Sequence, residues 1–320
     1  MARYAITGAT GFVGGALARR LVAAGHEVRA LVRRPDAATS LTALGVRLVP
    51  GDVAEGTGLD TLTHGVDGLF HVAGWYRVGQ RDGRATGERV NVRGTQQVLE
   101  AAQRAGVRRT VYTSTLAVNS DTRGRAVDES YRFSGRHLSN YDETKARAHA
   151  VAARVAADGQ PVVTVMPGLV YGPGDTSQTG DLLKEVVRGR RPLVPAGGTY
   201  CWAHVDDVAE GHVLAMERGQ VGREYMLAGP PATLADGLRL AADLAGKRGP
   251  VVIPTSAVRV AAALADVVGR VVPLPDTYQA ETLRSSIATY LGRADRAQRE
   301  LGWHARPLDV GLTETVAALR

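Results

Sequence analysis

Three glycines near the start of the chain constrain its fold more than any other feature of the sequence. The apolar run 4–6 leads into Gly8, Gly11 and Gly14, and a helical pattern follows over residues 12–24. The first glycine allows a tight turn, the second lets the backbone approach a pyrophosphate, and the third lets the helix pack closely on the strand. The helix N-terminus adds unpaired N–H groups and a partial positive charge. The opening therefore predicts a dinucleotide phosphate site.

The composition is that of an ordinary soluble globular protein. The 320 residues are 44% hydrophobic and 22% charged, enough for one large core or for a core with a smaller lobe. The formal net charge is +7, but the arginines are spread along the chain without a block of five like charges, so we expect no nucleic-acid partner. The single Cys201 excludes an internal disulfide and offers no zinc spacing, and we expect no metal.

The sequence predicts neither a leader nor a membrane span. A structural strand begins within four residues of Met1, so we expect no signal peptide and a cytoplasmic protein. The most apolar long stretch is 251–273, but a proline and three charged residues interrupt it: Pro254, Arg259, Asp266 and Arg270. We expect an amphipathic helix there rather than a span.

Strand-like and helical stretches alternate through the first half of the chain. Strands are predicted at 4–7, 26–32, 47–49, 68–72, 109–113 and 162–166, and helices at 12–24, 88–105 and 141–157. This alternation predicts an α/β fold, a Rossmann-type doubly wound parallel sheet whose ligands bind at the carboxyl ends of the strands.

Proline and glycine loosen this pattern after Met166, and it returns with a helix over 206–218 and a strand over 224–227. The interpretation that follows has two parts. A dinucleotide-binding Rossmann domain comprises 1–166 with 203–228, and a smaller, mostly helical substrate-binding lobe comprises 167–202 with 229–320.

The end of the second predicted strand bears on cofactor choice. Enzymes that use NAD usually carry an acid there to bind the adenosine ribose, whereas this strand ends in Arg33 and Arg34. Two guanidinium groups suit a 2′-phosphate, because it needs positive charge and paired N–H donors. A solvated arginine pair is the alternative. We expect NADP(H), with NAD(H) as the second choice.

Two further strand ends fit one cofactor groove. Asp52 can accept a hydrogen bond from the adenine amine, and Val53 can pack on its ring. Ala73 and Gly74 are small enough to leave room for the pyrophosphate and ribose. Each residue alone is typical of a turn, but their order along the chain outlines a groove.

Tyr141 and Lys145 lie four residues apart, on one face of a predicted helix. A phenol has a pKa near 10, and a neighbouring ammonium or an oxidised nicotinamide ring is expected to lower it. The hydroxyl run Thr113, Ser114 and Thr115 ends a predicted strand, where a hydroxyl can hydrogen-bond a substrate oxygen. A solvated helix pair is the alternative to a catalytic one.

Seven motifs, in family order, resemble the extended short-chain dehydrogenase/reductase family. They are Thr7–Gly14, Asn91–Thr95, Tyr112–Thr115, Tyr141-x-x-x-Lys145, Pro167–Pro173, His204–Ala209 and Arg299–Trp303. The branch that the chain resembles most contains dihydroflavonol-4-reductase-like and 3β-hydroxysteroid dehydrogenase-like oxidoreductases.

The resemblance implies roles for individual residues. Tyr141 is the general acid in reduction, Lys145 binds the nicotinamide ribose, and Thr115 replaces the usual catalytic serine, with Ser114 as the second candidate. Asn91 supports the site. The implied cofactor contacts also include Thr10, Phe12, Val13, Thr113, Pro167, Gly168, Leu169 and Val170. Family members also suggest a homodimer through the helix that carries Tyr141.

The same resemblance bears on the substrate. Relatives that act on nucleotide sugars commonly have an asparagine and an arginine where this chain has Leu169 and Tyr200, so polar anchors for a diphosphate are missing. Scarce aromatic residues are expected in loops at the pocket mouth, which favours a flat apolar carbonyl substrate: Trp75, Tyr76, Phe133, Tyr200 and Trp202. Packing between the lobes explains these aromatic residues equally well.

We therefore expect an NADP(H)-dependent oxidoreductase that interconverts a ketone or aldehyde, of an apolar or aromatic class, and its alcohol. A nucleotide-sugar epimerase or dehydratase and a non-catalytic NADP-binding regulator are the alternatives. His204, Asp206 and Asp207 are read as a helix start with an aspartate N-cap rather than as metal ligands. Arg136 and His137 belong either to the substrate site or to a solvated loop.

Overall fold

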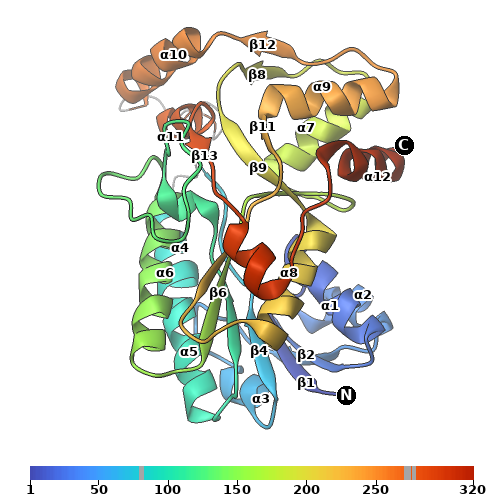
Figure 1. Cartoon of the computed structure of the whole chain (residues 1–320), viewed down its shortest axis with the longest axis vertical. Coiled ribbons are helices and arrows are strands. Elements are labelled where there is room, and N and C mark those ends of the chain that lie inside the picture. The colour runs from blue at the N-terminus through green and yellow to red at the C-terminus, as the bar shows by residue number, and fades with distance from the viewer. Residues whose placement is uncertain (79–82, 270–274, 276–278) are drawn as a thin grey trace.

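The computed structural model describes residues 1–78, 83–269, 275 and 279–320 (Figure 1). Within these residues, seven parallel strands form one sheet in the order β10-β6-β5-β4-β1-β2-β3. The strands are β1 Arg3–Thr7, β2 Glu27–Val32, β3 Arg47–Pro50, β4 Gly68–His71, β5 Thr110–Thr113, β6 Val162–Pro167 and β10 Glu224–Leu227. The predicted doubly wound parallel sheet is confirmed.

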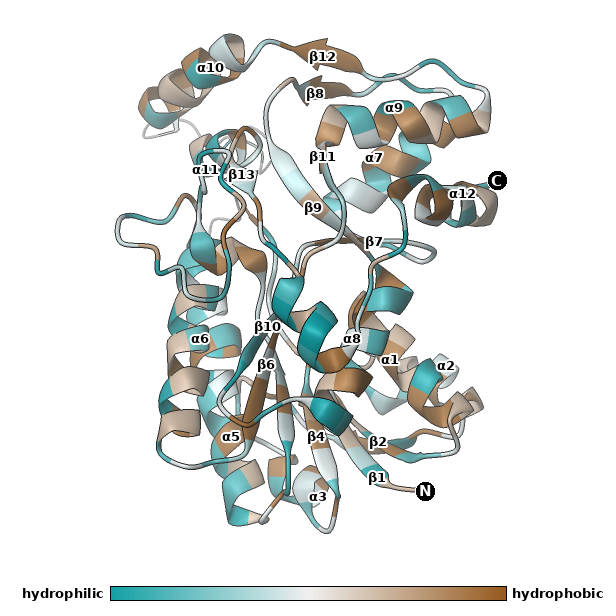
Figure 2. Cartoon of the chain, in the orientation of Figure 1, coloured by the Kyte–Doolittle hydropathy of each residue, from teal (hydrophilic) through white to brown (hydrophobic). Residues whose placement is uncertain are grey.

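Helices cover both faces of the sheet because alternate strand residues point to opposite sides. Ile6 and Phe70 belong to a core under α1 (Phe12–Ala23) and α8 (Val205–Arg218), whereas Ala5 and Leu69 belong to a separate core on the other face. The helices of that second face include α3 Leu59–Thr63, α5 Gly94–Arg104 and α6 Asn140–Ala157. Figure 2 shows the hydrophobic strands enclosed between these helices.

Short elements complete this half of the molecule. They are η1 Pro35–Ala37, α2 Thr39–Ala43, α4 Gly83–Gly87, the π-helical turn η2 Glu88–Arg93 and the 3₁₀ turn η3 Leu116–Asn119. The helix predicted at 88–105 therefore ends at Arg104 as α5, but begins with a π-helical turn that follows α4 directly.

The rest of the chain forms a lobe at the carboxyl edge of the sheet (Figure 1). Its strands are β7 Leu169–Tyr171, β8 Leu193–Pro195, β9 Thr199–His204, β11 Pro231–Thr233, β12 Val251–Ile253 and β13 Thr289–Tyr290. Its helices are α7 Gln178–Val187, α9 Leu234–Ala245, α10 Thr255–Val268, α11 Ala280–Ser285 and α12 Leu308–Leu319, whereas the π-helical turn η5 Ala297–Leu301 packs with α8 in the core of the sheet. Leu183, Trp202, Leu238 and Leu312 meet in its core.

The helix expected in the apolar stretch 251–273 is α10, while residues 270–273 lie outside the described part of the chain. No helix among the described residues has the length and apolar character needed to cross a membrane.

The topology brings the carboxyl ends of the strands that carry predicted site residues to one edge of the sheet. In a parallel sheet the carboxyl ends share one edge, and the strand order reverses between β1 and β4. The backbone of Gly8, after β1, passes close to that of Ala73, after β4: a Cβ on Gly8 would lie 2.6 Å from the Ala73 nitrogen. Gly8 also has a φ of 80°. Only glycine satisfies both requirements without strain.

We expect Gly8→Ala to lower the free energy of unfolding by about 3 kcal/mol, since it combines a left-handed backbone with a backbone clash. Gly25→Ala is the matched control, because Gly25 has a φ of 78° but no atom within 4 Å of the place where a Cβ would stand. It should lose only about 1 kcal/mol. Urea denaturation measures both values. Equal losses would contradict the importance of the β1–β4 approach.

Candidate active site

The turn after β1 has the geometry that a dinucleotide phosphate requires. Gly11 caps α1 with extended backbone and no side-chain hydrogen bond, and the first turn of α1 carries no acidic residue. A Cβ on Gly14 would overlap the carbonyl oxygen of Gly8, so this glycine permits the close packing of helix on strand. The N–H groups of Phe12 and Val13 begin the helix, and Thr10 and Gly11 are exposed. These residues fit a bound pyrophosphate.

Other residues of the expected groove lie along the same edge. Arg33 and Arg34 are exposed directly after β2. Asp52 accepts a hydrogen bond from the Ala54 nitrogen at 2.8 Å, which fixes its carboxylate in a turn. Val53 is mostly buried in the core of the second sheet face, so it has less surface for an adenine ring than the sequence suggested.

The β4 end lies beside the proposed catalytic helix. A Cβ on Gly74 would stand 3.5 Å from the Asn91 Oδ1 and 3.9 Å from the Lys145 Nζ. The side-chain amide of Asn91 accepts from the Trp75 nitrogen at 2.7 Å and donates to the Trp75 carbonyl at 3.0 Å and to Thr144 Oγ1 at 3.1 Å. Asn91 therefore connects the loop after β4 to α6, as support for the site.

The three hydroxyl residues at the end of β5 point in three directions. Thr113 Oγ1 bonds His212 Nε2 on α8 at 2.8 Å, and Ser114 Oγ bonds His149 Nδ1 on α6 at 2.8 Å. Thr115 hydrogen-bonds the phenol of Tyr141. Thr115 is therefore the strand-end hydroxyl beside the tyrosine, while the second candidate, Ser114, is buried and turned toward His149.

Tyr141 stands in the first turn of α6, which Ser139 caps by accepting the Asp142 N–H. Burial raises the pKa of Tyr141 to about 12, against a smaller opposing effect of the hydrogen bond with Thr115. From the sequence we expected Lys145 to lower this pKa. In the structure desolvation dominates instead, so the phenol keeps its proton at neutral pH.

Lys145, one turn later on α6, is buried beneath the site. Its ammonium donates to the Thr113 carbonyl at 2.8 Å and to the Tyr112 hydroxyl at 3.3 Å, and stands 5.0 Å from the centre of the Tyr112 ring. Burial lowers the pKa of Lys145 to about 7. Thr113 thus contributes through its backbone, and its hydroxyl is used elsewhere.

A buried polar chain links this lysine to the glycine turn. Tyr112 hydrogen-bonds Thr95, whose hydroxyl lies 3.0 Å from His71 Nε2. The other nitrogen of His71 lies 2.7 Å from Thr7 Oγ1, one residue before the glycine turn. Burial, and then the charge of Lys145, lower the pKa of His71 to about 3, so its ring is neutral. A neutral ring donates at one nitrogen and accepts at the other, which lets it join two hydroxyl groups.

A second buried arrangement joins Ser114, His149 and Glu224. His149 Nε2 lies 2.9 Å from Glu224 Oε1, so its ring joins a hydroxyl to a carboxylate, with the two ring nitrogens in the opposite order from a catalytic serine triad. Ser114 is only 4% exposed and so cannot meet a substrate as a nucleophile. The three residues instead tie β5, α6 and β10 together. His149 was not predicted, although it continues the four-residue spacing of Tyr141 and Lys145.

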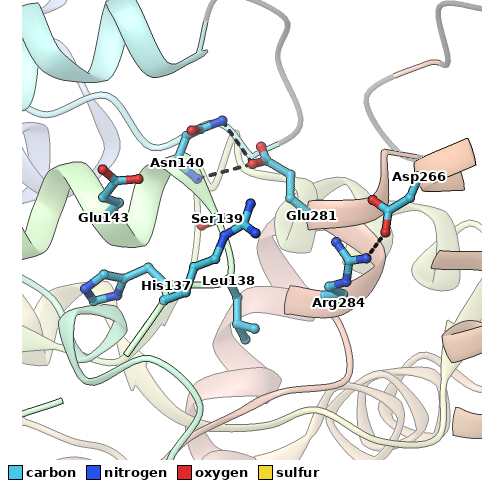
Figure 3. Close-up of a pocket in the computed structure, with 9 residues that line it drawn as sticks. His137, Leu138, Ser139, Asn140, Glu143, Asp266, Glu281 and Arg284 are labelled. Atoms are coloured by element: carbon cyan, nitrogen blue, oxygen red, sulfur yellow. Dashed lines mark hydrogen bonds and ion pairs between the residues drawn. The ribbon is translucent and has the colours of Figure 1, made fainter. Parts of the chain in front are cut away.

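A cavity of about 440 Å³ opens beside the start of α6 (Figure 3). Ser139 and Asn140, immediately before Tyr141, line one side, and Asp266 and Arg284 from α10 and α11 line the other. Arg136, His137, Leu138, Glu143 and Glu281 complete the lining. Glu281 accepts hydrogen bonds from the backbone and side chain of Asn140. The loop that includes Arg136 and His137 thus belongs to a cavity wall.

The predicted aromatic pocket needs correction. Trp202 lies on β9 with no exposed surface, in the lobe core, so it is not at a pocket mouth. Tyr200 also lies on β9, where its ring stacks on Tyr290 at 5.7 Å between centroids and its hydroxyl donates to the Ser285 carbonyl. Trp75 and Tyr76 follow β4, and Tyr76 is half exposed. We did not predict a strand over 199–204, because Gly197 and Gly198 immediately before it indicated a loop.

Tyr290 connects this aromatic pair to the catalytic helix. Its hydroxyl donates to Asp142 Oδ2 at 3.0 Å, and burial raises the pKa of Asp142 to about 7. No sequence signal marked Asp142 and Tyr290 as partners, because 148 residues separate them.

His204 and the acids near it form a helix cap. His204, not an aspartate as expected, is the N-cap of α8, with its Nδ1 accepting the Asp206 N–H. Its ring proton is therefore on Nε2, 3.8 Å from a Glu314 carboxylate that also binds Arg306. Asp207 pairs with Arg306 as well. The ligand atoms of His204, Asp206 and Glu314 lie within 4.8 Å of one another, and Glu314 is paired with Arg306.

Comparison with known proteins places the chain in a family. Residues 4–228 match the model of the NAD dependent epimerase/dehydratase family. The chain is 37% identical over 315 residues, 95% of its length and 92% of the relative, to 4-hydroxy-2-methyl-3-oxo-4-farnesyl-3,4-dihydroquinoline-1-oxide ketoreductase of Stigmatella aurantiaca. It is 39% identical to a putative dihydroflavonol 4-reductase of Synechocystis sp., over 70% of this chain and 67% of that one.

A solved structure agrees along the whole chain. The crystal structure of gox2253 superposes with a TM-score of 0.87 at 33% identity, covering 100% of this chain and 98% of the other. Together with the glycine turn and the Thr115, Tyr141 and Lys145 geometry, these likenesses decide the assignment. The chain belongs to the NAD dependent epimerase/dehydratase family, the extended short-chain dehydrogenases/reductases, in the branch of dihydroflavonol reductases and 3β-hydroxysteroid dehydrogenases.

Proposed function

We propose that the protein is an NADP(H)-dependent reductase that converts a ketone or aldehyde to its alcohol. The observation that carries the proposal is the protonated phenol of Tyr141, hydrogen-bonded to Thr115 at the carboxyl edge of the sheet, with Lys145 one turn later on α6. One relative is named as a ketoreductase of a farnesyl dihydroquinoline oxide and another as a putative dihydroflavonol 4-reductase, which supports a carbonyl substrate of an aromatic or apolar class.

The chain's own residues account for the proton and the oxygen. A substrate carbonyl oxygen between Tyr141 and Thr115 accepts two hydrogen bonds, which stabilise the negative charge that develops on it. Tyr141 then gives its proton to this oxygen as the general acid. The phenol is protonated at pH 7, and because its raised pKa makes it a weak acid, it gives up this proton only as the substrate oxygen gains alkoxide character. A bound reduced nicotinamide supplies the hydride.

Lys145 contributes by position and charge. Thr113 and Tyr112 hold its ammonium at the strand end, 3.9 Å from where a side chain on Gly74 would begin. In this place it can donate to the hydroxyls of a nicotinamide ribose. The residues Pro167, Gly168, Leu169 and Val170 continue from β6 into β7 along the same edge and are proposed to line the nicotinamide.

The family also contains enzymes named as nucleotide-sugar epimerases and dehydratases, which makes that class the second candidate. Tyr200 argues against it, because its ring and hydroxyl are occupied by Tyr290 and Ser285 where a sugar-nucleotide enzyme commonly has a diphosphate-binding arginine. Leu169 adds an apolar side chain where an amide is common.

Tyr141→Phe should lower kcat for carbonyl reduction by about 10²–10⁴-fold, since it removes the proton donor and leaves the ring. Tyr4→Phe is the control and should keep wild-type rates, because Tyr4 lies near the amino end of β1, away from the carboxyl edge of the sheet. NADPH oxidation with a panel of ring ketones measures both. Full activity in Tyr141→Phe would overturn the assignment. Conversion of a nucleotide sugar without net cofactor oxidation would establish the epimerase instead.

Replacing Arg33 and Arg34 together by alanine should raise KM for NADPH by about tenfold or more, because a 2′-phosphate loses charged hydrogen bonds. KM for NADH should stay within about twofold, since NADH carries no such phosphate. Arg47→Ala, at the amino end of β3, serves as the control for lost surface charge. An equal change for both cofactors would contradict 2′-phosphate recognition.

The affinity for NADPH should fall as pH rises through about 7. Below that pH Lys145 is an ammonium, and above it the buried amine is neutral and attracts ribose hydroxyls and phosphates more weakly. Lys145→Arg keeps its charge, so the extra pH dependence should vanish in that variant. Fluorescence titration of wild type, Lys145→Arg and the surface control Lys184→Arg tests this. Identical profiles for wild type and Lys145→Arg would exclude titration of Lys145.

A further inference from the structure

The helix α10 has apolar residues on both of its faces. Val258 and Ala262 are buried against the lobe. The opposite face exposes 44–62% of each of four large side chains, Val260, Leu264, Val267 and Val268. Ala257, Ala261 and Ala263 of the same helix are also exposed. A surface helix normally presents polar residues to water, so an exposed apolar face indicates a binding surface.

The neighbouring edge of the lobe continues this surface. Strands β8 and β12 pair in parallel, with Leu193 opposite Val251, and β12 leads through Pro254 into α10. Leu193 is 67% exposed and Val251 37%. Figures 1 and 2 show β8, β12 and α10 along one outer edge, with hydrophobic strands beside the helix.

Basic residues lie at the other end of the same two strands. Pairing of β8 with β12 brings the segments before them together, and Arg191 Nε donates to the Gly249 carbonyl. Five exposed cations occupy these segments: Arg188, Arg190, Arg191, Lys247 and Arg248. Across residues 181–191 and 243–248, the sequence has six basic residues and three acidic ones.

We infer that this edge, formed by α10, β8, β12 and the five cations, binds the surface of an anionic lipid bilayer. The apolar face of a helix lying flat can enter the boundary between headgroups and acyl chains while nearby cations contact anionic headgroups. With 14 residues, α10 is too short to span a bilayer and long enough to lie on it.

A lipid surface fits better than a second copy of the chain. The exposed side chains of α10 offer on the order of a few hundred Å² of apolar area, whereas a stable dimer needs about 800 Å² from each partner. A symmetric contact extending over the strands would also bring two excesses of positive charge together. An anionic bilayer is flat, extends beyond the helix and complements the charge.

The surface adjoins the cavity. Asp266 of α10 lines the cavity wall and pairs with Arg284 of α11. Binding through the outer face of α10 would therefore leave the cavity near the lipid. Vesicle binding can be measured without substrate, so its result is independent of the proposed reductase activity.

The test is co-sedimentation of the full chain with vesicles of phosphatidylcholine alone and of phosphatidylcholine with about 30% phosphatidylglycerol. We expect binding to the anionic vesicles that weakens with salt. Leu264→Ser with Val267→Ser should weaken it about tenfold or more. Lys247→Gln with Arg248→Gln should weaken it about tenfold and reduce its salt dependence.

Matched controls change apolar and basic residues that are exposed elsewhere on the protein. Val221→Ser with Val310→Ser, and Arg47→Gln with Arg154→Gln, should bind within about twofold of wild type. A dye attached at Leu264→Cys should shift its emission to the blue on vesicles, because Cys201 is buried and does not compete for the label. The same dye at Val310→Cys should not shift.

Absence of binding to anionic vesicles would overturn the inference, as would wild-type binding by the α10 variant. A concentration-dependent dimer in sedimentation velocity that the α10 variant abolishes would assign the face to a second copy. Unchanged thermal unfolding and unchanged NADPH oxidation with a water-soluble ketone confirm that the variants remain folded.

Discussion

The close approach of β1 and β4 is the constraint on which the rest of the site depends. The strand order reverses between them, so the connections after β1 and β4 lead to helices on opposite faces of the sheet and leave a crevice between them. Gly8 passes the Ala73 backbone at a distance that no side chain allows. The same pairing of β1 with β4 places Thr7 beside His71. From His71 the buried chain of hydrogen bonds runs through Thr95 and Tyr112 to Lys145.

That chain of hydrogen bonds connects the glycine turn to the Lys145 ammonium, two features that lie far apart in the sequence. Every member below the lysine is uncharged at neutral pH, because burial lowers the pKa of His71 and raises that of Tyr112. The ammonium of Lys145 is the buried cation above it, and its pKa is lowered for the same reason. Tyr141 is affected in the opposite sense, because burial disfavours the phenolate. Desolvation thus keeps the Tyr141 phenol protonated and makes the Lys145 ammonium easier to deprotonate.

Local features of the sequence predicted most of the fold. The glycine spacing, the alternating strands and helices, and the Tyr141–Lys145 spacing depend on neighbouring residues, and the family match and the structure agree with the predicted family and sheet. Contacts across the chain could not be predicted in this way. Ser114 was a candidate because its position along β5 is known, but its direction depends on His149 and Glu224.

The lobe was harder to predict for the same reason. Trp202 looked like a pocket residue because glycine and proline surround it, yet β9 carries it into a core made by α9 and α12. Likewise, the cap of α8 is His204, because its backbone is extended and its Nδ1 meets the Asp206 N–H. Long-range pairing of β9 decides the first outcome, whereas the cap of α8 is a local contact between residues two positions apart.

Transfer of a deuteride tests the central claim most directly. NADPH deuterated at the reactive C4 position is mixed with the enzyme and a ring ketone, and the alcohol is analysed by mass spectrometry. A reductase with Tyr141 as proton donor gives one deuterium on the carbinol carbon and one oxidised cofactor per alcohol. An alcohol without deuterium, or turnover that leaves the cofactor reduced, would contradict the account.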